Sequence, residues 1–176
     1  RRLSLFENLF PVPSGVAYNS YLILDEKTAL LDTVDSSISR QFLENVLHTL
    51  DSRPLDYLVI NHMEPDHCAN ISELLLRFPG LKIVGNAKTL TFIRQFYDMD
   101  LEGRTITVKE KDTLPLGRHT LHFYLTPMVH WPEVMMTYEE SENILFSADA
   151  FGSFIALDGK LFADEVNFDR DWIDEA

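Results

Sequence analysis

The sequence predicts an α/β (α+β) fold in which mixed β-sheets are flanked by α-helices. Short apolar runs of strand length recur along the chain, and stretches between them carry apolar residues at helical spacing. A pair of strands comes first, helices and strands then alternate, and the last third contains strand-like runs with short connections. This order is typical of mixed sheets with helices packed against them.

The first third of the chain contains mainly strand patterns. The N-terminal stretch RRLSLFENLFPVPSG predicts a first β-strand, and residues 18–24 and 28–34 predict two more, joined by a polar turn. Helical spacing begins near Ser36, and Ser36 or Ser37 is a candidate N-cap. The remaining elements are expected in this order: strand 55–60, helix 71–78, strand 81–85, helix 87–97, and strands 104–109, 119–126, 133–139 and 143–149.

The composition excludes several classes of partner. The chain has 176 residues, is 45% hydrophobic and carries a net charge of −13, so we expect no nucleic-acid or anionic-membrane partner, because both need a basic face. The sequence contains no apolar run long enough for a transmembrane helix. The single cysteine, Cys68, excludes an intrachain disulfide and favours a reducing, cytoplasmic location.

The stretch VINHMEPDHCAN, residues 59–70, is the strongest candidate for a functional site. Two histidines and two carboxylates stand within six positions, at His62, Glu64, Asp66 and His67. Buried imidazoles and carboxylates without partners are unfavourable, and a metal would supply the partner. In extended backbone the first three would share one face and His67 would turn away from it. We therefore expect a two-metal site in a loop, stiffened by Pro65, at the end of a buried strand.

Two later stretches are candidates to complete this site. TPMVHWPE, residues 126–133, places His130 between two prolines in a rigid loop after a predicted strand. SADAFGS, residues 147–153, places Asp149 just beyond another predicted strand. A carboxylate at that position can bridge two metals with its two oxygens.

Together these motifs resemble the metallo-β-lactamase superfamily and, within it, the flavodiiron proteins. The usual H-x-H-x-D-H signature of the superfamily has Glu64 in place of its second histidine here. That replacement, with PMVHWPE and LFSADAFG downstream and GVAYNSYLI upstream, is similar to flavodiiron proteins from about Phe6 to the last residue. The resemblance implies a metallo-β-lactamase-like αββα sandwich with a non-haem diiron centre at its rim.

The resemblance also implies a role for each candidate residue. His62, Glu64 and His130 would bind one iron, Asp66 and His67 the other, and Asp149 would bridge the two. Some members of the family leave the histidine equivalent to His67 off the metal. Trp131 would lie near the site and the flavin. Glu64 and Asp149 would stabilise the oxidised irons, although zinc would accept the same ligands.

The activity implied by the resemblance is the reduction of dioxygen to water, of nitric oxide to nitrous oxide, or of both. Electrons would arrive through FMN in a C-terminal flavodoxin-like domain, packed head-to-tail against the metal domain of a second subunit in a dimer or tetramer. Rubredoxin or a flavin reductase would supply these electrons. The metals and the flavin would carry the redox chemistry, while the protein supplies geometry and electrostatics.

The chain departs from the family pattern because it stops early. Residues 1–176 are expected to be the N-terminal part of the diiron domain, without its closing strands and helices and without the flavodoxin-like domain. One further histidine ligand of the second iron lies beyond this length in the family. The sequence also contains no FMN phosphate loop. We therefore expect the chain alone not to turn over with physiological electron donors.

Two alternative functions compete with this interpretation. A zinc hydrolase of the same superfamily would use a metal-bound hydroxide, but such hydrolases normally keep a histidine where this chain has Glu64. An inactive fragment could serve only as an oligomerisation module, but it would have no reason to retain the complete set of candidate ligands. Metal identity distinguishes the first two functions, and an absence of bound metal would indicate the third.

Overall fold

The computed structural model describes residues 5–6, 10–12, 15–152, 156, 160 and 162–165. The chain divides into two compact units, one formed by residues 19–150 and the other by residues 1–18 and 151–176. In the second unit, β1 (Leu5–Phe6) pairs antiparallel with β2 (Phe10–Pro11), and a short 3-10 helix, η2, spans Ala163–Glu165. The predicted N-terminal strand falls on this pair and partly outside the described residues.

A five-stranded mixed sheet forms the centre of residues 19–150. Its strand order is β3-β4-β5-β6-β7, with β3 antiparallel to β4 and the other neighbours parallel. The parallel strands therefore end at one common edge, where the loops that follow them can meet. The strands are β3 (Tyr21–Ile23), β4 (Ala29–Leu31), β5 (Tyr57–Val59), β6 (Lys82–Asn86) and β7 (Thr105–Val108).

A second, antiparallel sheet has the order β11-β10-β9-β8. Its strands are β8 (Thr113–Pro115), β9 (Thr120–Leu125), β10 (Met135–Glu139) and β11 (Ile144–Phe146). Three of these strands were predicted and β8 was not. Burial alternates along β9 and β10, as expected for strands with one face on a core and the other toward solvent.

Four α-helices connect the strands of the mixed sheet. They are α1 (Ser39–Leu50), α2 (Pro65–Cys68), α3 (Ile71–Arg77) and α4 (Ala87–Phe96), and a 3-10 helix, η1 (Ser36–Ile38), precedes α1. The predicted cap at Ser36 or Ser37 was wrong. The carboxylate of Asp35 accepts the hydrogen bond from the Ser37 amide, because η1 extends the helical stretch toward the N-terminus.

The two sheets pack face to face through a continuous apolar core. The mixed sheet contributes small and branched side chains, and the antiparallel sheet contributes larger ones that fill the space between them. The core cluster contains Ala29, Leu31, Val59, Val84 and Val108 on one side and Leu114, Leu121, Phe123, Met135 and Phe146 on the other. Burial of this surface is the main source of stability for the sandwich.

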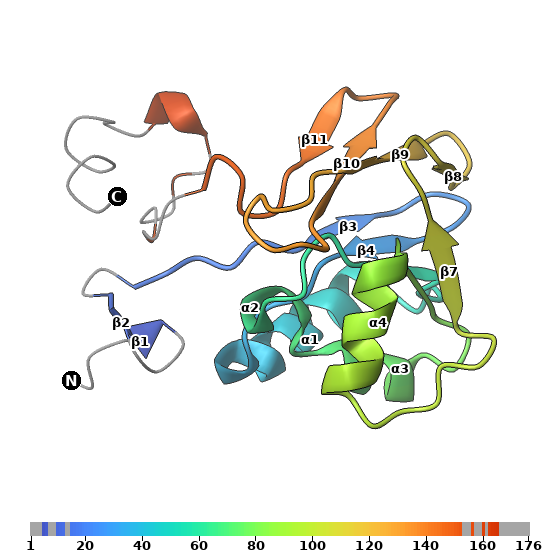
Figure 1. Cartoon of the computed structure of the whole chain (residues 1–176), viewed down its shortest axis with the longest axis horizontal. Coiled ribbons are helices and arrows are strands. Elements are labelled where there is room, and N and C mark those ends of the chain that lie inside the picture. The colour runs from blue at the N-terminus through green and yellow to red at the C-terminus, as the bar shows by residue number, and fades with distance from the viewer. Residues whose placement is uncertain are drawn as a thin grey trace. The chain divides into compact units, whose positions relative to one another are not determined.

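Helices cover the opposite face of the mixed sheet. In Figure 1, α1, α3 and α4 lie together on one side of β3 and β4, and β8–β11 lie on the other side. Buried residues from both layers meet there, among them Leu30, Leu58 and Ile83 of the sheet and Val46, Leu74 and Ile93 of the helices. No helix in the described part of the chain is long and apolar enough to cross a membrane.

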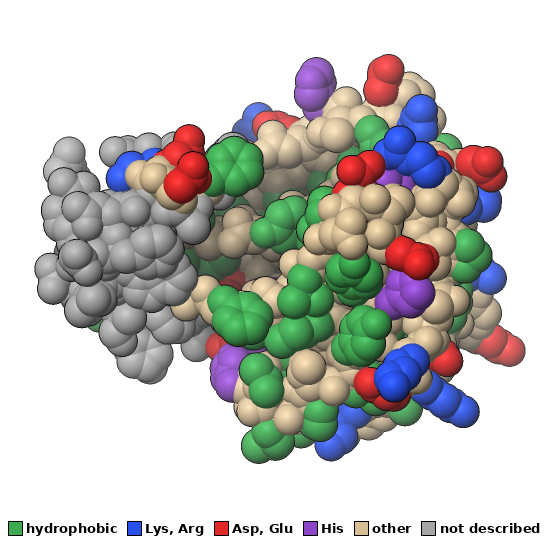
Figure 2. All heavy atoms as spheres, turned by 90° about the horizontal axis from the view of Figure 1, so that it is seen from above, with side chains coloured by type: hydrophobic (Ala, Val, Ile, Leu, Met, Phe, Trp, Pro, Cys, Tyr) green, Lys and Arg blue, Asp and Glu red, His purple; other side chains and the backbone are tan. Residues whose placement is uncertain are grey.

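The antiparallel sheet keeps partly exposed apolar side chains on its outer face. Met136 and Tyr138 alternate with buried neighbours along β10, and they pair with Tyr124 of β9 and Leu145 of β11. Figure 2 shows hydrophobic side chains gathered on this upper face. Within the described part of residues 19–150, the helices lie on the mixed sheet and leave this face uncovered (Figure 1).

Asn61 joins the two sheets at the edge where β5 ends. Asn61 is 1% exposed. Its backbone N–H donates to the Asp32 carboxylate at 2.7 Å, and its backbone carbonyl accepts from the Met135 N–H at 3.0 Å. Its side-chain oxygen accepts from the Thr137 hydroxyl at 2.7 Å. These bonds tie the loop after β5 to β10, so the two sheets are fixed to each other next to His62.

We expect Phe123→Ala to lower the free energy of unfolding by about 3–5 kcal/mol, because it leaves a cavity in the core between the sheets. Phe123 is completely buried in that core. Its neighbour Tyr124 points outward and is 37% exposed, so Tyr124→Ala should cost about 1 kcal/mol or less. Chemical denaturation of the two variants measures the difference, and equal losses would contradict the assignment of the two faces.

Candidate metal centre

The candidate residues of the first motif lie where β5 ends. The loop after β5 carries His62, which is completely buried, and Glu64, which is mostly buried. Helix α2 follows at once and carries Asp66 and His67. This edge, at the carboxyl ends of the parallel strands, is the usual place for a site in an open α/β sheet.

Helix α2 changes the predicted directions of these side chains. The backbone is extended at Glu64, but Pro65 lies in the first turn of a helix, where its fixed φ angle is favourable. The alternation expected for extended backbone therefore ends at Glu64. The sequence analysis expected His67 to leave the face shared by the other three residues and to serve the second ion. In the structure its Nε2 atom lies 2.7 Å from Asp149 Oδ1.

Asp149 reaches histidines on both sides of the site. Its Oδ1 atom faces His67, while its Oδ2 atom lies 3.1 Å from Nε2 of His130 and 3.2 Å from Nε2 of His62. Glu64 Oε2 lies 3.0 Å from His62 Nε2 and 2.9 Å from His130 Nε2. The three separate sequence motifs thus meet at one point.

One donor atom from each of four residues could hold a metal ion. These atoms belong to His62, Glu64, His130 and Asp149 and lie within 4.8 Å of one another. Imidazole nitrogen and carboxylate oxygen are ligands that zinc and non-haem iron both accept. The second oxygen of Asp149, Oδ1, lies 2.7 Å from Nε2 of His67, which is not one of these four residues.

Asp66 has an oxygen that lacks a partner. Its Oδ1 atom is buried and makes no hydrogen bond to the described residues, and its Oδ2 atom lies 3.8 Å from His67 Nε2. Burial raises the pKa of this carboxyl to about 6, although the charge of His67 opposes the shift. A buried carboxylate oxygen without a partner is unfavourable, and a cation would remove this penalty. Asp66 therefore fits a metal site.

Two further carboxylates lie behind the histidines. Glu133 Oε1 lies 2.8 Å from Nδ1 of His62, and Asp32 Oδ2 lies 3.3 Å from Nδ1 of His67. Both carboxylates are buried, with Glu133 1% and Asp32 4% exposed. Each histidine thus uses Nδ1 toward the protein and turns Nε2 toward the site, as metal-binding histidines commonly do.

The carboxylates favour protonated histidines when no metal is bound. Burial lowers the pKa of His62, but the three carboxylates around its imidazole outweigh burial and raise the pKa to about 11. For His67, burial is likewise outweighed by Asp149 and Asp32, and the pKa rises to about 10. Burial raises the pKa of Asp149, yet its bonds to the two histidines hold that pKa far below its ordinary value.

Trp131 forms one wall beside the histidines. Its ring centroid lies 5.3 Å from that of His62 and 6.3 Å from that of His130, with the rings edge to face. The indole is therefore next to the candidate site. Its contact with a flavin stays a prediction.

Glu133 and Asp32 were missed by the sequence analysis. Glu133 lies in the same quoted motif as His130, and Asp32 directly follows β4. In the sequence each is only an acidic residue beside a strand, and acidic residues are common at such positions in solvent-exposed turns. Only the packing of the two sheets brings these carboxylates to the histidines.

Comparison with known proteins places this geometry in a family. A family model described as ODP family beta lactamase matches residues 16–173. The chain belongs to this family. The predicted resemblance to flavodiiron proteins is confirmed by the relatives and solved structures that match this chain. The same matches confirm the predicted fold class.

Several curated relatives of this ODP-family chain are nitric oxide reductases by name. The anaerobic nitric oxide reductase flavorubredoxin of Pectobacterium atrosepticum is 45% identical over 154 residues, which is 87% of this chain and 30% of that protein. A flavorubredoxin homolog from Escherichia coli O157:H7 is 43% identical and is covered to 37% of its length. The chain thus spans about a third of these relatives.

Solved flavodiiron structures have the same fold. Rubredoxin oxygen:oxidoreductase from Desulfovibrio gigas superposes with a TM-score of 0.85 at 33% identity, covering 96% of this chain and 41% of that one. The flavodiiron protein of Giardia intestinalis gives a TM-score of 0.83 at 30% identity, covering 94% of this chain and 40% of that one. The ODP-family chain therefore shares its fold with about two fifths of each of these proteins.

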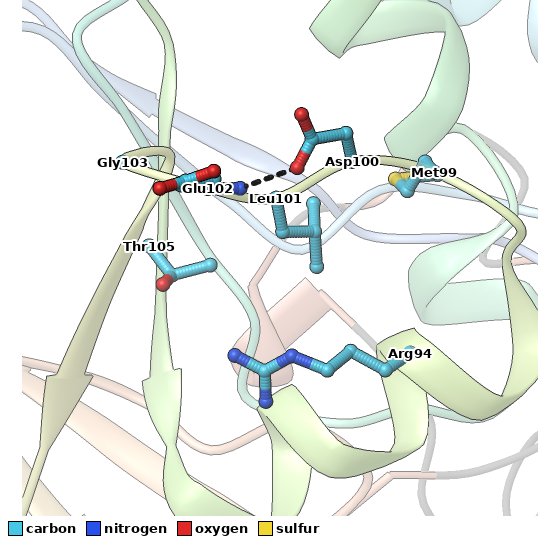
Figure 3. A pocket seen from close by; sticks show the side chains of 7 residues that line it. All are labelled: Arg94, Met99, Asp100, Leu101, Glu102, Gly103 and Thr105. Atoms are coloured by element: carbon cyan, nitrogen blue, oxygen red, sulfur yellow. Dashed lines mark hydrogen bonds between the residues drawn. The ribbon is translucent and has the colours of Figure 1, made fainter.

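A separate hollow lies beside α4 and outside this histidine cluster (Figure 3). Its volume is about 470 Å³, and Arg94 of α4 faces the loop that leads to β7. Asp100 in that loop accepts a hydrogen bond from the Glu102 amide at 2.9 Å, so its carboxylate closes a turn. The hollow has no histidine or cysteine in its lining, and nothing in it indicates a metal site.

We expect the metal-free chain to lose stability as the pH rises above neutrality. His62 and His67 have pKa values of about 11 and about 10 when folded, against 6.5 for an ordinary histidine, so their protonation stabilises the fold fully below pH 6.5. This contribution is lost progressively as the pH rises through the folded values. Denaturation of chelator-treated protein near pH 6 and near pH 9 measures the loss.

The control for this prediction is a histidine outside the site. His122→Gln removes an imidazole that pairs with Glu140 on the outer face of a strand. The free energy of unfolding of this variant should therefore fall with pH as it does in the wild type. His67→Gln should reduce the fall in the free energy of unfolding between pH 6 and pH 9, because one of the two histidines with a raised pKa is gone. A free energy of unfolding that rises between the two pH values would contradict the electrostatic description.

Proposed function

We propose that this chain is the metal-binding part of a non-haem diiron oxidoreductase that reduces nitric oxide, dioxygen or both. The observation that carries the proposal is the position of Asp149, whose two oxygens face different histidines. A carboxylate so placed fits a bridge between two metal ions. His62, Glu64 and His130 would hold one ion, and Asp66 and His67 the other.

The donor set favours iron over zinc. Glu64 replaces the imidazole that hydrolases of the superfamily have at this position, so Glu64, Asp66 and Asp149 bring three negative charges to two ions. Hard anionic oxygen ligands favour the higher oxidation state of iron, and mixed imidazole and carboxylate shells suit non-haem iron. Iron bound there would supply redox electrons and open positions for a diatomic substrate.

The residues of the chain would prepare the site for this chemistry. His62 and Glu64 come from a loop held at both ends by hydrogen bonds, so their positions are set before any ion binds. The imidazole of His62 is completely buried, and the ring of Trp131 packs edge to face against it at 5.3 Å between centroids. Such preorganised charges and dipoles need no rearrangement during the reaction.

The names of the relatives support both substrates. Relatives that are 42–45% identical are named nitric oxide reductases, whereas the Desulfovibrio gigas structure is an oxygen oxidoreductase. We therefore propose both activities for the parent protein, with FMN in a separate flavodoxin-like domain, rubredoxin or a flavin reductase as electron donor, and head-to-tail assembly of subunits. Residues 1–176 alone would need a chemical reductant.

Metal analysis tests the proposal. Protein purified anaerobically from iron-replete cells should contain close to two irons per chain. Asp149→Asn should lower this count to one or fewer, because an amide gives up the charge and one of the two bridging oxygens. After chemical reduction, the wild-type protein should consume nitric oxide with formation of nitrous oxide, or consume dioxygen, whereas Asp149→Asn should not.

The control variant is Glu142→Gln. Glu142 lies in the turn between β10 and β11 and pairs with Arg118 at 3.1 Å, so this variant should retain the wild-type iron content. Zinc in place of iron after iron-replete growth would favour the hydrolase alternative. A chain that binds neither metal at stoichiometric level would overturn the proposal for this chain.

A further inference from the structure

Glu133 is a buried acid whose carboxylate contacts the loop that carries His62. It lies just before β10, its side chain is 1% exposed, and its Oε1 atom lies 2.8 Å from His62 Nδ1. The same oxygen accepts a hydrogen bond from the Met63 amide at 2.9 Å. One carboxylate oxygen therefore holds both the backbone and the side chain of the loop after β5.

The hydrogen bonds of Glu133 fix the orientation of one imidazole. A carboxylate can only accept hydrogen bonds, so Nδ1 of His62 must be the donor. Its Nε2 atom then faces Glu64 and Asp149 at 3.0 Å and 3.2 Å. Only this arrangement leaves the lone pair of Nε2 free for a metal.

Glu133 also links the two loops that contribute histidines. Its own carbonyl accepts a hydrogen bond from the Asn86 side chain at 2.6 Å, which anchors it at the end of β6. His130 lies three residues earlier in the same loop, and the backbone of Thr126 and Val134 closes that loop at 3.0 Å. A shift of Glu133 would therefore move His62 and His130 relative to each other.

The second oxygen of Glu133 indicates that its charge matters. Oε2 is buried and has no hydrogen-bond partner among the described residues. A glutamine could accept both existing bonds through its single oxygen, so a purely structural role would not need the charge. A buried negative charge with one orphaned oxygen is unfavourable unless positive charge is close by.

We propose that Glu133 is a positioning residue of the metal centre, which fixes Nδ1–H of His62 and strengthens the hold of its Nε2 on the metal through its negative charge. The inference rests on the proposed function, because it requires that His62 is a metal ligand. Carboxylates behind metal-binding histidines raise the basicity of the imidazole and set its direction. The ion affected would be the one held by His62, Glu64 and His130.

The chain contains a matched control for this role. Glu139 lies on β10, is 2% exposed, and its Oε1 atom lies 3.0 Å from Nδ1 of His119. It also accepts from the Ser141 and Glu142 amides, so it closes the turn after β10. Glu133 and Glu139 are thus two buried glutamates that each bind a histidine, and only Glu133 faces the candidate metal centre.

The test is the affinity for Co²⁺, measured by titration of metal-free protein in competition with a chelator. Glu133→Gln should weaken binding of the first Co²⁺ ion by roughly 10–100-fold and should shift its visible absorption bands. Glu139→Gln should leave the affinity and the bands unchanged. Circular dichroism of the metal-free variants checks that each is folded.

The outcomes separate this inference from the proposed function. Wild-type affinity and unchanged bands in Glu133→Gln would overturn the inference alone, and failure of the wild-type chain to bind Co²⁺ would overturn both. If Glu133→Gln does not fold, nitrogen-15 NMR of the zinc-loaded wild-type protein tests the role of Glu133 instead. A slowly exchanging proton on Nδ1 of His62, shifted downfield, would support the role of Glu133, and its absence would refute it.

Discussion

The structure depends on the hydrogen bonds of one buried residue, Asn61. This residue lies within the run of buried positions that begins in β5, and its three bonds reach Asp32 just after β4 and Met135 and Thr137 in β10. Both sheets are therefore fixed to each other immediately before His62. Without that connection the apolar core could still form, but it would not determine how the loops at the rim face one another, because apolar contacts are non-directional.

The main elements could be predicted from sequence because their signals are local. Apolar spacing identified α1, α3 and α4, and short apolar runs identified the eight strands β3–β7 and β9–β11. Strand β8 was missed because three residues, one of them Pro115, carry little pattern. Helix α2 was missed because it has only four residues.

Only part of the candidate site could be predicted from the sequence, and there is a physical reason why the rest could not. His62, Glu64, Asp66 and His67 stand close together in sequence, so their chemistry was visible there. Glu133 lies 71 residues from His62, and nothing near it in sequence indicates that the two meet. Such partners depend on the register of β10 against β9 and on the packing of two sheets, neither of which the sequence pattern fixes.

The long separation between the candidate ligands has a consequence for folding. His67 and Asp149 are 82 residues apart, and Glu64 and His130 are 66 apart, so the ligand set exists only after both sheets have paired and closed on each other. Contacts of this range form late and slowly. A metal ion cannot therefore act as a nucleus for the chain. It would bind a nearly finished frame, and its stabilising contacts, absent from the folding transition state, would act by slowing the unfolding rate.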